Sequence, residues 1–290
     1  MSPVSVVTDT THYLPRELVA SSELHEVSLY VNFGPPNGSL QRESDITDYA
    51  VFYDQLRTAD SLPTTSQPSI GDFLAVYEPL LEQGRDVVAV LIAGGISGTL
   101  ESARQAAEEA LRSRPGRRIE VVDSLSSAGG LGLIALAGSA AARAGADVDA
   151  VVERIEAAKE ATKIWFAVDT LEYLRRGGRI GTAQAWLGGA LKIKPILTLN
   201  GEITPLERVR TSGRAFERMV DYMHARDEDG ADCWVIQHIQ AHDVAERLIE
   251  RGRDIFGTEP YFVSEVGPVI GAHIGPGLVG VGGLPMALLR

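Results

Sequence analysis

The chain has 290 residues, and its 27 Lys and Arg against 39 Asp and Glu leave a formal net charge of −12. This acidic balance argues against a nucleic-acid-binding protein, because phosphate recognition needs clustered Lys and Arg. The single cysteine, Cys233, excludes an intramolecular disulfide and a cysteine-based metal cluster. The length predicts two domains, each with enough residues for a hydrophobic core.

The sequence predicts neither a signal peptide nor a membrane span. The N-terminus lacks a basic region followed by a long apolar stretch. Residues 124–142 are uncharged and interrupted by serines and glycines, which indicates a buried, Ala-rich helix. Residues 266–289 carry seven Gly and three Pro, which favours a loop and a buried strand. We therefore expect a cytoplasmic protein.

In the first half of the chain, short β-branched runs alternate with longer helical patterns. We predict strands at Val4–Val7, Glu26–Phe33, Asp86–Ala93 and Arg118–Val122. Helices are predicted at Pro15–Ser22, Ile46–Leu56, Phe73–Glu82, Leu100–Arg112, residues 124–142 and Val148–Ala161. The polar stretch Ser61–Ser69 is predicted to be a loop. Strands that alternate with helices predict a mainly parallel sheet covered on both faces.

After about residue 162 the pattern changes to one of antiparallel pairs and helices. Strands are predicted at Lys163–Val168, Lys194–Leu199, Ile203–Val209, Ala231–Ile239 and Tyr261–Val266. Helices are predicted at Thr170–Arg176, Thr182–Leu187, Gly213–Ala225 and Asp243–Phe256. Asn200-Gly201 predicts a hairpin, because both residues accept a positive φ. We predict an α/β protein with a three-layer α/β/α domain (1–162) and a two-layer α/β domain with a mixed sheet (163–290).

The junction from Ala93 to Thr99 is a candidate anion-binding site. An apolar strand ends there, a Gly-rich turn follows, and a helix starts near Thr99. Ligands of open α/β sheets bind beside such turns, where the helix N-terminus offers unpaired N–H groups. Ser97 and Thr99 add hydroxyls, and the alternative is that one of them only caps the helix.

Several known catalytic motifs are absent from this junction. It contains neither the GxxxxGK[ST] of a nucleotide-binding P-loop nor GxGxxG. Ser97 stands in Gly95-Ile96-Ser97-Gly98-Thr99, which misses the GxSxG of a hydrolase nucleophile elbow because the second glycine comes one place too early.

Three further segments carry candidate binding residues. The loop hydroxyls Thr64, Thr65 and Ser66 precede a serine that could cap the next helix. His273 is a single imidazole on a predicted turn of glycines and proline. Two interpretations stay open for it, contact with a ligand and a purely structural role. The basic turn at residues 174–179 (LRRGGR) either binds a carboxylate or phosphate, or ends a helix that a glycine caps.

We expect no metal site. His238 and His242 are four residues apart, but a predicted strand-to-helix junction separates them, and the chain has no His-Glu-x-x-His motif.

Six segments, taken in order, resemble the DegV family. They are Asp9-Thr10-Thr11, Thr65-Ser66-Gln67-Pro68-Ser69, Ile96-Ser97-Gly98-Thr99, residues 169–180 (DTLEYLRRGGRI), Ile193-Lys194-Pro195-Ile196 and residues 271–277 (GAHIGPG). The resemblance covers essentially the whole chain. The family comprises bacterial two-domain fatty-acid-binding proteins that act as lipid-carrying subunits of fatty acid kinase.

The resemblance implies a long-chain fatty acid in an apolar tunnel between the two domains. The hydroxyls of Thr65 and Ser97 and the backbone N–H of Gly98 would hold its carboxylate. His273 and an arginine, Arg175 or Arg210, would lie near the head group.

A protein of this family would not itself be an enzyme and would need no cofactor. A separate ATP-binding kinase subunit would phosphorylate the bound carboxylate. An acyltransferase would then pass the acyl phosphate into phospholipid synthesis, with transient membrane contact. This chain departs from the family at Ala93-Gly94, where members often carry serines, and at His12 and Tyr13, to which we transfer no role.

Elementary energetics are consistent with this expectation. Burying about fifteen methylenes at ~0.8 kcal/mol each supplies on the order of 12 kcal/mol before binding losses. A buried carboxylate must be paired, and hydroxyls at a helix N-terminus provide that pairing. Two alternatives stay open: a serine hydrolase with Ser97 as nucleophile, His273 as base and Asp169 as third member, and a carrier of another small carboxylate or a dihydroxyacetone-like ligand.

Overall fold

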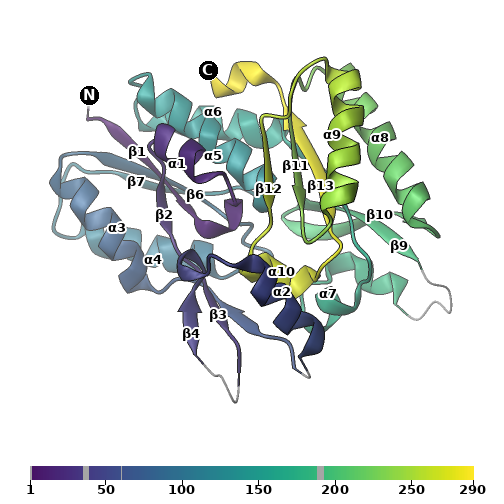
Figure 1. Ribbon diagram of the computed structural model, residues 1–290. Coiled ribbons are helices and arrows are strands. Elements are labelled where there is room, and N and C mark those ends of the chain that lie inside the picture. The colour runs from purple at the N-terminus through teal and green to yellow at the C-terminus, as the bar shows by residue number, and fades with distance from the viewer. Residues whose placement is uncertain (1, 35–38, 60, 188–192) are drawn as a thin grey trace.

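The computed structural model describes residues 2–34, 39–59, 61–187 and 193–290. The strands within these residues form three sheets (Figure 1). A four-stranded sheet has the order β2-β1-β6-β7, and a six-stranded sheet has the order β10-β9-β8-β13-β11-β12. A small sheet, β4-β3-β5, lies at the lower edge of the molecule in Figure 1.

The four-stranded sheet is parallel throughout and covered on both faces. Its strands are β1 (Val4–Asp9), β2 (His25–Val27), β6 (Asp86–Leu91) and β7 (Ile119–Asp123). Its helices are α1 (Arg16–Ser21), α3 (Ile70–Glu82), α4 (Thr99–Leu111), α5 (Ala128–Arg143) and α6 (Val148–Ala161). Alternate valines of β1 and β6 pack into two separate cores, one under α3 and α4 and the other under α5 and α6.

The six-stranded sheet is mixed, since only β11 and β12 run parallel. Its strands are β8 (Lys163–Ala167), β9 (Lys194–Asn200), β10 (Glu202–Val209), β11 (Cys233–His238), β12 (Phe262–Glu265) and β13 (Val279–Leu284). Helices α8 (Ser212–Glu228) and α9 (His242–Phe256) cover its outer face (Figure 1). The predicted α/β fold class is confirmed, whereas the division into domains 1–162 and 163–290 stays a prediction.

Helix α5 lies between the two large sheets and contacts strands of both. Its residues 129–141 are all buried, as the Ala-rich pattern predicted. The glycines in it allow close packing, because a Cβ at Gly138 would overlap the side chain of Ile155. Among the described residues, no helix combines the length and the apolar character that crossing a bilayer requires.

The remaining elements are short. They are the strands β3 (Tyr30–Asn32), β4 (Leu40–Arg42) and β5 (Thr64–Ser66), and the helices α2 (Tyr49–Thr58), α7 (Glu172–Arg176) and α10 (Pro268–Ile274). Short 3₁₀-helices lie at Thr10–His12, Glu43–Asp45, Gly181–Trp186 and Met286–Leu289.

Three sequence predictions of local structure were wrong. The single strand predicted at Glu26–Phe33 is two strands, β2 and β3, in different sheets. The loop predicted at Ser61–Ser69 contains strand β5, which pairs with β3. Strands of three residues are too short for a periodic pattern, so only the pairing partner reveals them.

The third correction concerns the environment of His273. The stretch predicted as a glycine-rich turn forms the helix α10, which has Pro268 in its first turn and ends at Gly275 with a φ of 77°. Proline at the start and a left-handed glycine at the end are the usual boundaries of a helix, and they enclose a segment of seven residues here.

Candidate ligand-binding pocket

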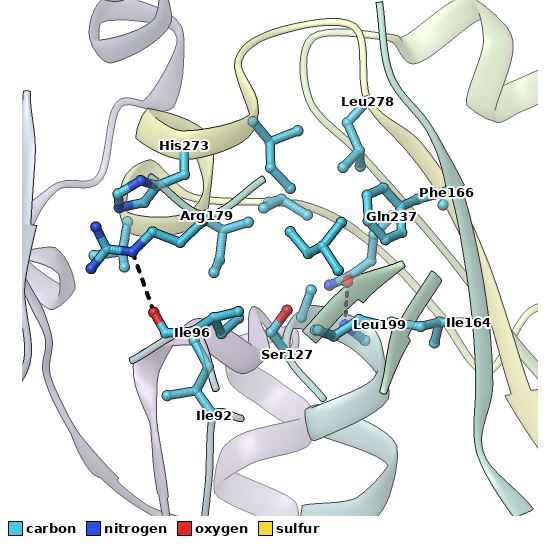
Figure 2. Close-up of a pocket in the computed structure, with 18 of the residues that line it drawn as sticks. Ile92, Ile96, Ser127, Ile164, Phe166, Arg179, Leu199, Gln237, His273 and Leu278 are labelled. Atoms are coloured by element: carbon cyan, nitrogen blue, oxygen red, sulfur yellow. Dashed lines mark hydrogen bonds between the residues drawn. The ribbon is translucent and has the colours of Figure 1, made fainter. Parts of the chain in front are cut away.

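A cavity of about 1030 Å³, counted with its open mouth, lies between the inner face of the six-stranded sheet and the carboxyl end of β6 (Figure 2). His273 and Arg179 lie at one end of it, whereas Phe166, Gln237 and Leu199 lie at the other (Figure 2). The cavity is therefore long and has two chemically different ends.

The apolar part of the cavity is the inner face of the six-stranded sheet. Ile164 and Phe166 of β8, Val235 of β11 and Leu199 of β9 point into it. Alternate residues of the same strands, such as Trp165 and Ile236, pack on the other face against α8 and α9. The period of two along a strand thus separates the pocket wall from the outer core.

Two glycines of β13 widen this wall. Gly280 and Gly282 stand opposite Phe166 and Ile164 of β8 in the register, and both line the cavity. A Cβ at Gly280 would meet its neighbours only at ordinary contact distances of 3.4 Å or more. The sequence VGVGGL therefore places valines toward the outer core and glycines toward the cavity.

Figure 2 labels two polar side chains away from the mouth, Ser127 and Gln237, and the amide of Gln237 is fully used. Its Oε1 accepts a hydrogen bond from the backbone N–H of Gly129, the second residue of α5. Its Nε2 donates to Ser264 Oγ at 2.8 Å and to the carbonyl of His12 at 3.4 Å. These bonds tie β11 to β12 and α5 and satisfy the amide of Gln237.

Hydroxyl, imidazole and guanidinium groups gather at the mouth. Thr65 of β5, Ser97 of the turn after β6, His273 of α10 and Arg179 all line the cavity. Thr65 Oγ1 lies 2.7 Å from Nε2 of His273. Four segments that are far apart in the sequence thus place polar groups around one opening.

The turn before α4 presents a helix N-terminus to this mouth. Gly98 is the N-cap residue of α4, and because it has no side chain it makes no side-chain capping bond. Ser97 Oγ lies 2.8 Å from Thr99 Oγ1 and accepts a hydrogen bond from the N–H of Thr99 at 3.3 Å. A Cβ at Gly98 would press against the Gln67 amide, so glycine permits Gln67 to lie over the turn. Uncapped N–H groups and a helix dipole favour an anion here.

The position of His273 depends on a buried carboxylate, Glu43. Its Oε1 accepts hydrogen bonds from Tyr13 Oη at 2.7 Å and from the N–H of Val269 at 2.8 Å, and its Oε2 accepts one from Thr10 Oγ1 at 2.6 Å. Val269 is the second residue of α10, the helix that carries His273. The segment Asp9-Thr10-Thr11 therefore reaches the pocket through Glu43.

The imidazole of His273 is neutral at pH 7. Burial and the neighbouring Arg179 guanidinium lower the pKa of His273 to about 4. Gly177 packs against its Nδ1, where a Cβ would overlap the ring. The second glycine, Gly178, has a φ of 70° and turns the chain back after α7.

That reversal decides which arginine reaches the pocket. Arg175 stays on the exposed side of α7 and pairs with Glu172 at 2.6 Å. Arg210 is exposed and does not line the cavity. Arg179 lines it, and its Nε donates to the carbonyl of Ile96 at 3.4 Å (Figure 2). The sequence motif contained Arg179, but nothing in the spacing distinguished it from Arg175.

The three residues considered for a serine hydrolase do not form a connected triad. The Nε2 of His273 is bonded to Thr65, and the hydroxyl of Ser97 is bonded to Thr99. Asp169 forms an ion pair with Lys194. A nucleophile needs a base within hydrogen-bond reach, and within the described part of the chain no hydrogen bond joins Ser97 to His273.

Comparison with known proteins identifies the family. The family model described as an uncharacterised protein of the DegV family matches residues 3–285. The chain belongs to the DegV family. A DegV domain-containing protein of Streptomyces coelicolor is 39% identical over 281 residues, which are 96% of this chain and 97% of that protein.

Solved structures of DegV proteins have the same fold. A DegV family protein from Thermus thermophilus, described as fatty acid binding, superimposes with a TM-score of 0.87 at 33% identity and covers 98% of this chain and 99% of its own. DegV of Bacillus subtilis, described as a fatty acid binding protein, has a TM-score of 0.87 at 31% identity and covers 98% of this chain and 100% of its own.

Proposed function

We propose that this DegV-family chain binds a long-chain fatty acid in the cavity and presents its carboxylate at the mouth to a separate ATP-dependent kinase. The observation that supports the proposal is the division of one cavity into an apolar sheet face and a polar rim of Thr65, Ser97, Gly98 and His273. The related proteins described as fatty acid binding support the same ligand class.

The tail lies along the inner face of the six-stranded sheet. Each methylene that leaves water contributes about 0.8 kcal/mol, so a chain of about fifteen supplies the main driving force. Gly280 leaves space for the acyl chain beside Phe166.

The carboxylate lies at the N-terminus of α4. Thr65 and Ser97 donate their hydroxyl hydrogens to it, and the N–H of Gly98 adds a third charge-assisted bond. For Thr65 to donate outward, its oxygen must accept a hydrogen bond from Nε2–H of His273, which fixes the tautomer of that imidazole. Arg179, rather than Arg175 or Arg210, supplies the nearby positive charge.

A separate kinase subunit phosphorylates the carboxylate while it is bound at the mouth of the cavity. Hydroxyl donors leave an oxygen free for phosphoryl transfer, which a bidentate arginine would occupy. The sequence holds no P-loop motif, so ATP binds to the kinase subunit. An acyltransferase then consumes the acyl phosphate, and the fatty acid carrier itself performs no chemistry.

The double variant Thr65→Val with Ser97→Ala tests the site assignment. It removes both hydroxyls while keeping size and shape, so we expect loss of at least tenfold in fatty acid affinity with an unchanged circular-dichroism spectrum. Mass spectrometry of extracted lipid measures occupancy after expression. The matched control Thr64→Val with Ser61→Ala changes nearby exposed hydroxyls that do not line the cavity and retains the lipid. Full occupancy in the first double variant would refute the assignment.

A second measurement tests the division of labour. Loaded protein incubated with ATP and Mg²⁺ alone forms no acyl phosphate, as detected by trapping with hydroxylamine. Adding a fatty acid kinase subunit gives the acyl hydroxamate. Product formed without that subunit would show that this chain is an enzyme. An extracted ligand with a short chain would favour the carrier of a small carboxylate instead.

A further inference from the structure

Three metal-binding side chains meet outside the pocket, at the carboxyl ends of β11 and β12. His238 ends β11, Glu265 ends β12, and His242 begins α9. His238 and Glu265 are directly opposite in the parallel register of the two strands. One nitrogen of each imidazole and one carboxylate oxygen lie within 4.8 Å of one another.

The connection between β11 and α9 brings the two imidazoles together. Gln240 adopts a φ of 49°, a left-handed conformation that is rare for a residue with a side chain. The chain reverses there, and the ring centroids of His238 and His242 come to lie 4.4 Å apart. The strand-to-helix junction that separates the histidines in the sequence is thus the feature that joins them in space.

The same turn fixes the carboxylate. Glu265 Oε1 accepts hydrogen bonds from the N–H of Gln240 at 3.1 Å and from its Nε2 at 2.6 Å. Carboxylates that bind metals are commonly held by such second partners, which orient them.

His238 has an unused nitrogen in this cluster. Only 6% of the residue is exposed, and its Nδ1 is buried without a hydrogen-bond partner among the described residues. A buried polar atom that lacks a partner destabilises the fold. A metal cation is a partner that His238, His242 and Glu265 could bind together.

We propose that His238, His242 and Glu265 bind a divalent transition-metal ion, with Zn²⁺ as the best match. Two imidazole nitrogens and one carboxylate oxygen are the donors of three-ligand zinc sites, which leave a fourth position for water. Mg²⁺ and Ca²⁺ prefer oxygen ligands alone. Because the side chain of His242 is exposed, it gives the ion a path of entry and can rotate to complete the coordination.

This site is separate from the fatty acid pocket. Gln237 faces the cavity, so the next residue, His238, faces the opposite side of the sheet. The same alternation holds for β12, where Ser264 bonds Gln237 and Glu265 lies beyond it. Metal binding at this site therefore does not depend on lipid binding in the cavity.

Calorimetric titration of Zn²⁺ into the chelator-treated full-length protein tests the proposal. We expect one ion per chain in the wild type, and affinity at least about tenfold lower in His242→Ala and in Glu265→Gln. Both substitutions lie at partly or fully exposed side chains, and circular dichroism checks that each variant folds. The control His224→Ala removes an exposed histidine of α8 and leaves binding unchanged.

Two further probes make the result specific. Co²⁺ in place of Zn²⁺ gives visible absorption bands that disappear in His242→Ala, and Mg²⁺ gives no binding heat. The proposal is overturned if the wild type takes up no stoichiometric Zn²⁺, if His242→Ala binds as tightly as the wild type, or if His224→Ala loses binding equally.

Discussion

Glu43 connects three separate segments of the chain through one carboxylate. Its partners are Thr10 and Tyr13 after β1, and Val269 at the start of α10. These three donors favour the ionised form, but burial opposes it more strongly and raises the pKa of Glu43 to about 7. The helix that carries His273 is therefore docked on a group that titrates near neutrality.

The variant Glu43→Gln tests this residue through pH. The native state holds a proton on Glu43 between pH 4.5 and about 7, whereas the unfolded state does not. The free energy of unfolding contributed by this group therefore falls as pH rises through that range, by at most about 3 kcal/mol. Glutamine does not titrate, so we expect urea denaturation to show the wild type losing stability relative to the variant between pH 4.5 and about 7. A difference that is constant with pH would contradict the assignment.

The strand β13 shows how one element shapes the pocket. Val279 and Val281 belong to the core under α8 and α9, whereas Gly280 and Gly282 face the cavity. The valines stabilise the strand by packing in the outer core, and the glycines add no side chain on the cavity side. A sequence pattern of valine alternating with glycine on a buried strand thus indicates a cavity on the glycine side.

Gly280→Leu fills that space from within the strand. Its backbone needs no positive φ, and the new Cβ meets only ordinary contacts, so the fold is retained. We expect the longer side chain to exclude long tails and to leave shorter fatty acids or an empty protein, as measured by mass spectrometry of the extract. Gly213→Leu, at an exposed position with open space around it, is the matched control and keeps the wild-type lipid. If fatty acids of equal length were extracted from both variants, the tail would not lie beside Gly280.

The whole molecule encloses the cavity with segments from both ends of the chain. β5, the turn before α4, α5, the six-stranded sheet and α10 all contribute to its lining. A ligand that touches all of them binds the folded state and has no equivalent site in the unfolded chain. Binding at 100 times the dissociation constant then stabilises the fold by about 2.7 kcal/mol.

Removing the lipid tests whether ligand binding stabilises the folded state. We expect extraction of the bound lipid to lower the melting temperature and added oleic acid to restore it. The variant Thr65→Val with Ser97→Ala, which lacks the carboxylate donors, responds much less to the same addition. A melting temperature that is identical with and without lipid would show that the ligand does not bridge these elements.

Much of the pocket could be predicted from the sequence, because several of its groups belong to local signals. Ser97 and Gly98 follow an apolar strand at a glycine turn, and Thr65 stands in a distinctive run of hydroxyls. The structure places all three, with His273, around one mouth. Their role as carboxylate ligands stays a prediction until the double variant is measured.

Other features had no local signal. Arg179 differs from Arg175 only by lying beyond Gly178, whose φ of 70° turns the chain toward the cavity. Glu43 is an unremarkable acid in a polar stretch of the sequence, and its burial depends on Tyr13 and α10. The pairing of β3 with β5 is equally invisible to periodicity, because each strand has three residues.

The sequence by itself determined the alternation of strands and helices, the mainly parallel and mixed sheets, the Asn200-Gly201 hairpin and the family, because these depend on periodicity, turn chemistry and ordered motifs. The tertiary structure alone decided which side chains share a space. Contacts between distant segments, such as Thr65 with His273 or His238 with Glu265, arise from the closing of sheets and loops on one another, and no local pattern records that closure.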